Sequence, residues 1–129
     1  DGEQSMAAIL DAVREYKPAA LLTHSRSDFH NDHLLIYNAC LPTQRLAYFD
    51  FFSYHPSNCR PVPIAFHPNV YVDISETIDA KMHAITAHAS QFGGRGLDNE
   101  MYREFAHVQG RMIGCTYAEG LDVQRLLLT

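Results

Sequence analysis

The sequence lacks several features that would point to particular classes of protein. Only three cysteines occur (Cys40, Cys59 and Cys115), and because no Cys-x-x-Cys pair exists, buried reduced thiols are favoured over a zinc knuckle or a disulfide framework. No apolar run approaches the roughly 18 residues that a membrane-spanning helix needs, and the N-terminus does not resemble a signal peptide. Basic clusters are also absent, and a formal net charge of −5 argues against binding to nucleic acid or to an anionic membrane surface. These absences predict a soluble, cytoplasmic protein.

The length and composition are those of a globular protein. The 129 residues are enough for one domain, or a piece of one, with a hydrophobic core. Hydrophobic residues make up 47% of the chain and charged residues 19%, with no internal repeat and no linker-like segment. We therefore expect a single domain over residues 1–129.

The first part of the chain alternates between helical and extended patterns. Apolar residues recur at helical spacing from Met6 onward, and Pro18 ends that segment. The short apolar run at 19–23 predicts a strand buried on both faces. A polar loop follows, and residues 32–41 then predict a helix that Pro42 ends. Helix, strand, loop and helix in this order indicate an α/β sheet protein.

The second part adds further strands and helices. Aromatic-rich and alternating segments predict strands at 46–54 and 69–74, whereas apolar stripes predict helices at 76–91 and 101–115. Ser75 is a good N-cap for the first of these helices. Residues 121–128 could form an edge strand at the end of the chain.

Two histidines and two aspartates lie within the six residues from Asp28 to His33, directly after the first predicted strand. His30 and His33 are three residues apart, so at a helix start their rings lie near one face. Imidazole and carboxylate are the ligands of catalytic zinc, and ligand sites gather at the carboxyl ends of strands in open α/β sheets. A plain helix cap, with Asn31 or Asp32 holding the free backbone N–H groups, explains the same residues.

Three segments, in order along the chain, resemble the LmbE-like, or PIG-L, family of zinc-dependent N-deacetylases. KPAALLTHSRSDFHNDH (17–33) resembles the family pattern P-D-V-V-x-T-H…D-x-H-x-D-H. FHPNVYVDISETIDAKMHAITAHASQF (66–92) is similar to PNVFVDIS…K…A…H.SQ, and FAHVQGRMIGCTYAEGL (105–121) is similar to the family's late helix. The resemblance implies a Rossmann-like, three-layer α/β fold with helices on both faces of the sheet.

The resemblance also implies roles for three residues. His33 would be a zinc ligand, and His30 would stabilise the oxyanion and help to protonate the leaving amine. Asp32 would orient His30 and raise its pKa. Zinc would polarise the amide carbonyl and lower the pKa of its bound water, although iron, cobalt or nickel could compete for the same ligands. The implied reaction is hydrolysis of an N-acetyl group on an amino sugar or glycoconjugate.

The sequence departs from the family pattern in two places. Asn31 stands where the family usually has proline, a mild change because both residues suit a helix start. The family's A-H-P-D-D segment, which supplies the other His and Asp ligands and the general base, does not occur. We therefore expect the chain to be the C-terminal portion of such an enzyme. It would be inactive alone and would associate as a homo-oligomer or with a complementary N-terminal fragment. The alternative is a non-catalytic binding or assembly subunit.

The remaining candidate residues carry weaker signals. His24 could face the metal pocket or be a structural histidine. Asp28 could contact substrate or position the loop, and the second role is favoured. His55 and His67 both precede proline and are expected at the surface. The aromatic residues within 48–52 could form a sugar-stacking wall or the core of a strand. No site is assigned to the histidines of the predicted helices, which are His83, His88 and His107.

Overall fold

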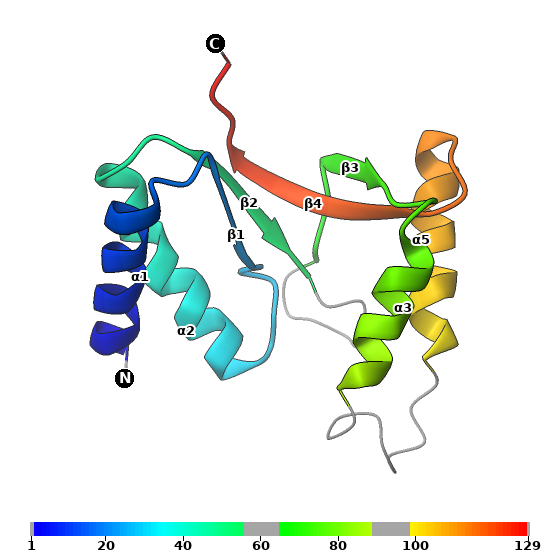
Figure 1. Cartoon of the computed structure of the whole chain (residues 1–129), viewed down its shortest axis with the longest axis horizontal. Helices are drawn as coiled ribbons and strands as arrows, with labels where there is room; N and C mark the ends of the chain where they lie inside the picture. The colour runs from blue at the N-terminus through cyan, green and yellow to red at the C-terminus, as the bar shows by residue number, and fades with distance from the viewer. Residues whose placement is uncertain (1, 56–64, 89–98, 129) are drawn as a thin grey trace. The chain divides into compact units, whose positions relative to one another are not determined.

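The computed structural model describes residues 2–55, 65–88 and 99–128. Figure 1 shows the elements in chain order, which are α1 (Gly2–Tyr16), β1 (Ala20–His24), α2 (Asn31–Cys40), the 3₁₀ helix η1 (Leu41–Arg45), β2 (Asp50–Tyr54), β3 (Val70–Asp73), α3 (Ile78–Ala87), α5 (Glu100–Ile113) and β4 (Ala118–Arg125). Within these ranges no helix combines the length and the apolar character needed to cross a membrane.

The strands form a mixed four-stranded sheet in the order β1-β2-β4-β3. Backbone contacts divide the described residues into two compact units. The first contains residues 2–55, 65–70 and 121–128, and the second contains residues 71–88 and 99–120. Helices and a mixed sheet confirm the predicted α/β class. Organisation as a single domain stays a prediction, and β4 contributes residues to both units.

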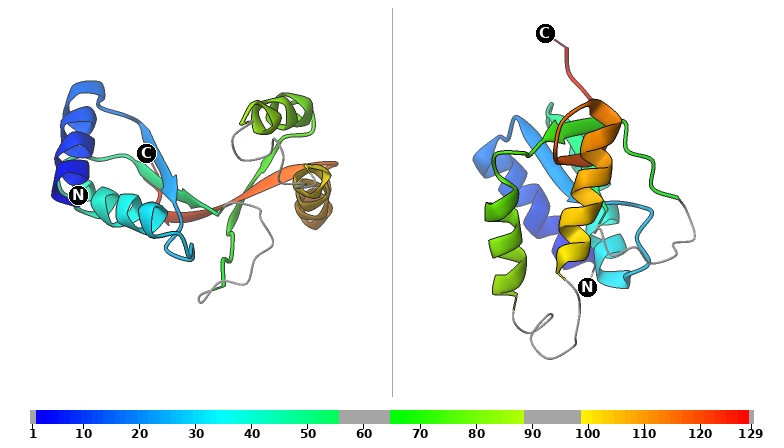
Figure 2. Two further views of the ribbon diagram at one scale, coloured as in Figure 1. Left: turned by 90° about the horizontal axis from the view of Figure 1, so that it is seen from below. Right: turned by 90° about the vertical axis from the view of Figure 1, so that its right-hand side faces the viewer.

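In the first unit, β1 and β2 run parallel and in register from Ala20 opposite Asp50 to His24 opposite Tyr54. Strand β4 is antiparallel to β2. Because the carboxyl ends of parallel strands meet at one edge, the last residues of β1 and β2 are neighbours there. Helices α1 and α2 pack against each other, and α2 also contacts β1 (Figures 1 and 2).

The core of the first unit is formed by α1, α2, β1, β2 and the segment that leads into β2. It consists of Val13, Cys40, Phe49 and Phe51, with Ile9, Leu21, Ile36 and Ala47 packed against them. The rings of Phe49 and Phe51 meet edge-to-face with centroids 6.3 Å apart, and both are fully buried. These two aromatic residues are therefore core residues rather than a sugar-stacking wall, whereas Tyr48 is exposed.

The prediction that β1 is buried on both faces is wrong. Leu21 packs on the core and Thr23 is buried, but Leu22 points to the other face and is 55% exposed. Side chains alternate between the two faces of a strand, and in the part of the chain that the structure describes only one face of β1 is covered. An apolar run shows that a strand is suited to burial on both faces. It does not show that another part of the protein covers each face.

Two further expectations need correction. The last strand is not an edge strand, because β4 lies between β2 and β3 in the sheet order. Ser75 does not cap α3, whose N-cap is Thr77. Instead, the Ser75 hydroxyl donates to Asp73 Oδ1 at 2.6 Å and accepts from Tyr117 N–H at 3.1 Å. Ser75 thus joins the end of β3 to the segment before β4. The last residues of the predicted helix, 89–91, lie outside the described ranges.

Arg125, at the end of β4, fixes the chain that leads into β2. Its guanidinium donates to three backbone carbonyls, those of Gln44 at 2.9 Å, Ala47 at 3.0 Å and Phe49 at 3.0 Å. The same group lies 4.9 Å from the centroid of the Phe49 ring. Bonds from a charged donor are among the stronger hydrogen bonds in proteins, and the planar fork of arginine can reach several carbonyls at once.

Replacing Arg125 with alanine should lower the free energy of unfolding by about 3 kcal/mol, because three carbonyls lose a charged donor. Lysine at the same position keeps the charge but not the fork, so it should recover only part of this loss. Urea denaturation followed by circular dichroism measures both. The exposed Arg14, paired with Asp11 at 3.2 Å, is the control, and its change to alanine should cost about 0.5 kcal/mol or less. Equal effects at the two positions would contradict this role of Arg125.

The second unit is built around α3 and α5, which pack against each other. Its core consists of Ile74, Ile78, Met82 and Ala106, with Ile85, Tyr102 and Tyr117 against them. Ion pairs join the elements at the surface: Lys81 pairs with Glu119, and Arg103 with Asp79 at 2.8 Å. Gly110 lies against the backbone of Thr116 and Tyr117, and Gly114 ends α5 with a φ of 84°.

Candidate functional site

The polar motif lies in the first unit, where the chain leaves β1 and enters α2. The loop is fixed by its own backbone and serines: Asp28 N–H donates to Ser25 O at 3.1 Å, and Ser27 N–H donates to Ser25 Oγ at 3.0 Å. Ser27 Oγ also donates to Ala65 O at 3.3 Å. The N-cap of α2 is His30, whose side chain makes no capping hydrogen bond. The motif is therefore not a plain helix cap.

Asp28 and His33 form the tightest contact of the site. Asp28 Oδ2 lies 2.7 Å from His33 Nδ1, and Oδ1 accepts the backbone N–H of His30 at 2.9 Å. The Asp28 side chain is only 2% exposed, whereas that of His33 is 32% exposed. Burial raises the pKa of Asp28, but the hydrogen bonds from His30 and His33 outweigh it and hold the pKa below its ordinary value.

The ionisation state of the Asp28 carboxylate determines which ring nitrogen of His33 carries the proton. An ionised carboxylate only accepts hydrogen bonds, so the proton of the neutral His33 ring resides on Nδ1. The lone pair is then on Nε2, on the opposite side of the ring. This is the usual arrangement of a metal-ligating histidine, in which a carboxylate holds the other ring nitrogen.

Four rings lie together at the site. The His24 and His33 rings stack with centroids 3.9 Å apart and an angle of 2° between their planes. The Tyr54 centroid lies 5.1 Å from that of His24, and the His30 centroid lies 4.6 Å from that of His33. Burial, followed by the neighbouring His33, lowers the pKa of His24. Burial and the nearby Asp28 charge raise the pKa of Tyr54.

The structure places the three predicted site residues at the start of α2. His33 is half-buried, whereas the side chains of His30 and Asp32 are 53% and 86% exposed. His30 Nδ1 lies 3.9 Å from Asp32 Oδ2, which is close enough for charge attraction but too far for a hydrogen bond. His30 and His33 thus meet through their rings, with Asp32 beside His30. Their catalytic and ligand roles stay predictions.

His24, Asp28 and His33 together could offer a metal ion one ligand atom each, with these atoms within 4.8 Å of one another. The distance between Asp28 and His33 favours fewer than three of these residues as ligands. The 2.7 Å between Asp28 Oδ2 and His33 Nδ1 is a hydrogen-bond length, whereas two ligands at about 2.0–2.1 Å from a tetrahedral ion lie roughly 3.3 Å apart. If His33 binds a metal, this distance favours Nε2 as its ligand atom, with Asp28 holding Nδ1. The donor chemistry fits a metal.

Sequence patterns left the role of His24 open. Both His55 and His67 were expected at the surface, but only His67 is exposed, and His55 is half-buried. Nε2 of His55 is buried without a hydrogen-bond partner among the described residues, and the ring stacks on Phe66 at 5.6 Å. His55 also lies close enough to Asp28 for their charges to interact. The available signal was its position directly after the strand parallel to β1, since the ends of parallel strands meet at one edge.

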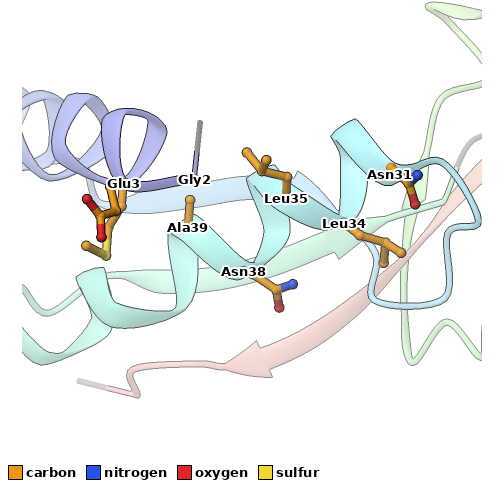
Figure 3. Close-up of a pocket in the computed structure, with 8 residues that line it drawn as sticks. Gly2, Glu3, Asn31, Leu34, Leu35, Asn38 and Ala39 are labelled. Carbon is orange, nitrogen blue, oxygen red and sulfur yellow. The ribbon is translucent and has the colours of Figure 1, made fainter.

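A separate hollow of the first unit lies away from the stacked rings. Figure 3 shows a pocket between α1 and α2, lined by Gly2, Glu3, Met6, Asn31, Leu34, Leu35, Asn38 and Ala39. Asn31 is the member of this set that comes from the polar motif, and none of the stacked rings is part of the lining. We assign the chemistry to the histidine and aspartate cluster rather than to this pocket.

Solved structures with the same fold include two deacetylases. The conserved protein TT1542 from Thermus thermophilus matches 98% of the chain with a TM-score of 0.77 and 22% identity. Dbv21, a deacetylase of the antimicrobial A40926 pseudoaglycone, matches 100% with a TM-score of 0.68 and 19% identity. The N,N'-diacetylchitobiose deacetylase from Pyrococcus horikoshii matches 94% with a TM-score of 0.62 and 18% identity.

These matches show the fold of the chain. It has a mixed α/β fold like that of the deacetylases, with an open sheet. The chain spans 60% of the length of the first two proteins and 51% of the third. No family model matches the sequence. Fold and site together define an α/β protein whose fold is like that of two deacetylases and which carries a histidine and aspartate cluster that could hold a metal ion.

Proposed function

We propose that the chain forms part of the site of a zinc-dependent N-deacetylase. The observation that carries this proposal is the His33–Asp28 pair with His30 beside it, on a fold that two deacetylases share. The reaction would be hydrolysis of a linear amide, releasing acetate and a free amine from an acetylated amino sugar or glycoconjugate. The chitobiose deacetylase named above supports this substrate class.

Each residue of the motif has a distinct task in this proposal. His33 Nε2 would hold the metal, while Asp28 keeps the proton on Nδ1 and the ring in place. Zinc, when bound, would polarise the amide carbonyl and lower the pKa of its water. The remaining ligands and the general base would come from residues outside those that the structure describes, as in the family that the motif resembles.

His30 is placed to act on the substrate. Its ring lies 4.6 Å from that of His33, and its half-exposed side chain is open to an incoming molecule. In the protonated form it would donate a hydrogen bond to the carbonyl oxygen as negative charge develops there, and it would then protonate the leaving amine. Asp32, 3.9 Å from Nδ1, would favour that protonated form.

Zinc uptake at His33 tests the metal part of the proposal. In ¹⁵N spectra of labelled histidine in the protein that carries this chain, adding zinc should shift the Nε2 signal of His33 and leave Nδ1 protonated by its bond to Asp28. His33→Ala should abolish the saturable zinc response, with His83→Ala as the matched control, since His83 lies on α3 in the second unit. Saturable binding that survives His33→Ala would contradict the assignment.

A non-catalytic binding or assembly subunit is the second candidate function. It rests on one observation: the described residues supply a single assigned metal ligand, His33, and the H-P-D-D pattern does not occur within the 129 residues given. Acetate release from N-acetylated amino sugars separates the two candidates. Release by the protein that carries this chain, and its loss in the His30→Ala variant, would support the enzyme. Zinc binding without any acetate release would support the subunit.

A further inference from the structure

His24, whose role the sequence left open, makes its closest ring contact with His33. It is the last residue of β1, and hydrogen bonding to β2 keeps its backbone in register opposite Tyr54. Its ring lies flat against that of His33, with 3.9 Å between centroids and 2° between planes. The Tyr54 ring is tilted by 53° to that of His24, with 5.1 Å between centroids, so the His24 ring has two ring neighbours.

Two features of the His24 ring bear on its role. First, Nδ1 is buried and makes no hydrogen bond to a described residue, so no such bond fixes the ring. Second, the lone pair of an imidazole nitrogen lies in the plane of its ring. The His24 and His33 rings are stacked and nearly parallel, so their planes do not converge on one point, as those of two histidine ligands of a single ion would. A stacked ring, in contrast, hinders rotation of its neighbour in the closely packed region between them.

We propose that His24 is a positioning residue, whose ring fixes the plane of His33 so that Nε2 is presented in one direction. Asp28 holds one edge of the His33 ring through Nδ1, but a single hydrogen bond leaves the ring free to tilt about it. The stack on His24 removes that tilt. Two contacts from different directions then define the orientation, as a preformed metal ligand requires. The link to a metal rests on the proposed function, whereas the ordering of the ring does not.

The first experiment is carried out without metal and tests the inference by itself. The side-chain order of His33 is measured by NMR relaxation of its ¹³Cε1–H group in the wild type and in the variants His24→Phe, His24→Leu and His24→Ala. Phenylalanine keeps a flat ring and loses only the nitrogens, whereas leucine fills space without a flat face. We expect the wild type and His24→Phe to show the same order, and the other two variants to show a more mobile His33. An unchanged amide spectrum shows in each case that the fold is retained.

The second experiment measures zinc affinity in the same four proteins. His24→Ala and His24→Leu should bind zinc about 10-fold more weakly, and His24→Phe should bind as the wild type does. If His24→Phe binds as weakly as His24→Ala, His24 is a ligand and the inference is overturned. Equal order of His33 in all four proteins overturns it as well. If the wild type takes up no zinc, the proposed function fails, while the first experiment still decides the role of His24.

Discussion

Replacing Gly110 with alanine should lower the free energy of unfolding by about 3 kcal/mol or more, because the position has no room for a side chain. A Cβ there would lie 2.7 Å from the backbone C and O of Thr116 and from the N of Tyr117. Backbone atoms cannot rotate away as a side chain can. Moving them would strain the bond from Ile74 N–H to Tyr117 O, which is 2.9 Å long and holds β3 to this segment.

Gly114 is the matched control for Gly110, since it lies four residues away at the end of the same helix. A Cβ at Gly114 would meet no atom within 4 Å, but its φ of 84° is unfavourable for other residues. Gly114→Ala should therefore cost about 1–2 kcal/mol, and Gly114→Asn less. Urea denaturation followed by circular dichroism measures both positions. A Gly110→Ala protein as stable as the wild type would show that α5 and the segment before β4 do not pack this closely.

Replacing Asp28 with asparagine should weaken zinc binding by about 10- to 100-fold with little change in the fold. Oδ1 of residue 28 accepts the His30 N–H, so the amide NH₂ of asparagine would face His33 Nδ1. An NH₂ group only donates, so Nδ1 would have to become the acceptor and the ring proton would move to Nε2. The nitrogen that should bind the metal would then carry a proton.

The ¹⁵N shifts of the His33 ring report this change of tautomer directly, and the zinc titration reports its consequence. Asp32→Asn is the matched control, because it is the same substitution in the same motif at a side chain that is 86% exposed. It should leave zinc affinity and the His33 tautomer as they are, and should slow turnover through His30 instead. A zinc affinity unchanged by Asp28→Asn would exclude Asp28 as the residue that orients His33.

Much of the fold could be predicted from local patterns. The helices and strands follow the spacing of apolar residues and the prolines, and the α/β class follows from their order. Boundaries were less predictable. The strand expected from 46 begins at Asp50, because residues 46–49 are irregular, and the carbonyls of Ala47 and Phe49 accept from Arg125 rather than from a neighbouring strand. The place of β4 inside the sheet could not be predicted, because strand order depends on pairing between residues far apart in the chain.

The candidate site, like the fold, was predicted only in part from the sequence. His30, Asp32 and His33 are close in sequence, so a short motif was enough to bring them together at the start of a helix. His55 was missed because it follows a different strand, and it comes near Asp28 through the parallel pairing of β1 with β2. The choice between the possible roles of His24 also required the fold, since a stacked ring is recognised by the angle between two planes.

The sequence alone was enough to predict the α/β class, to locate the polar motif after the first strand, and to indicate the type of chemistry that the motif can support. Local spacing and residue type carry that information, because helices, strands and short loops form between near neighbours. The folded structure was needed to see that Asp28 is buried against His33, that His24 lies flat on the same ring, and that Gly110 contacts backbone. Each of these depends on how close two groups come and how they face each other, which is set by packing across the fold.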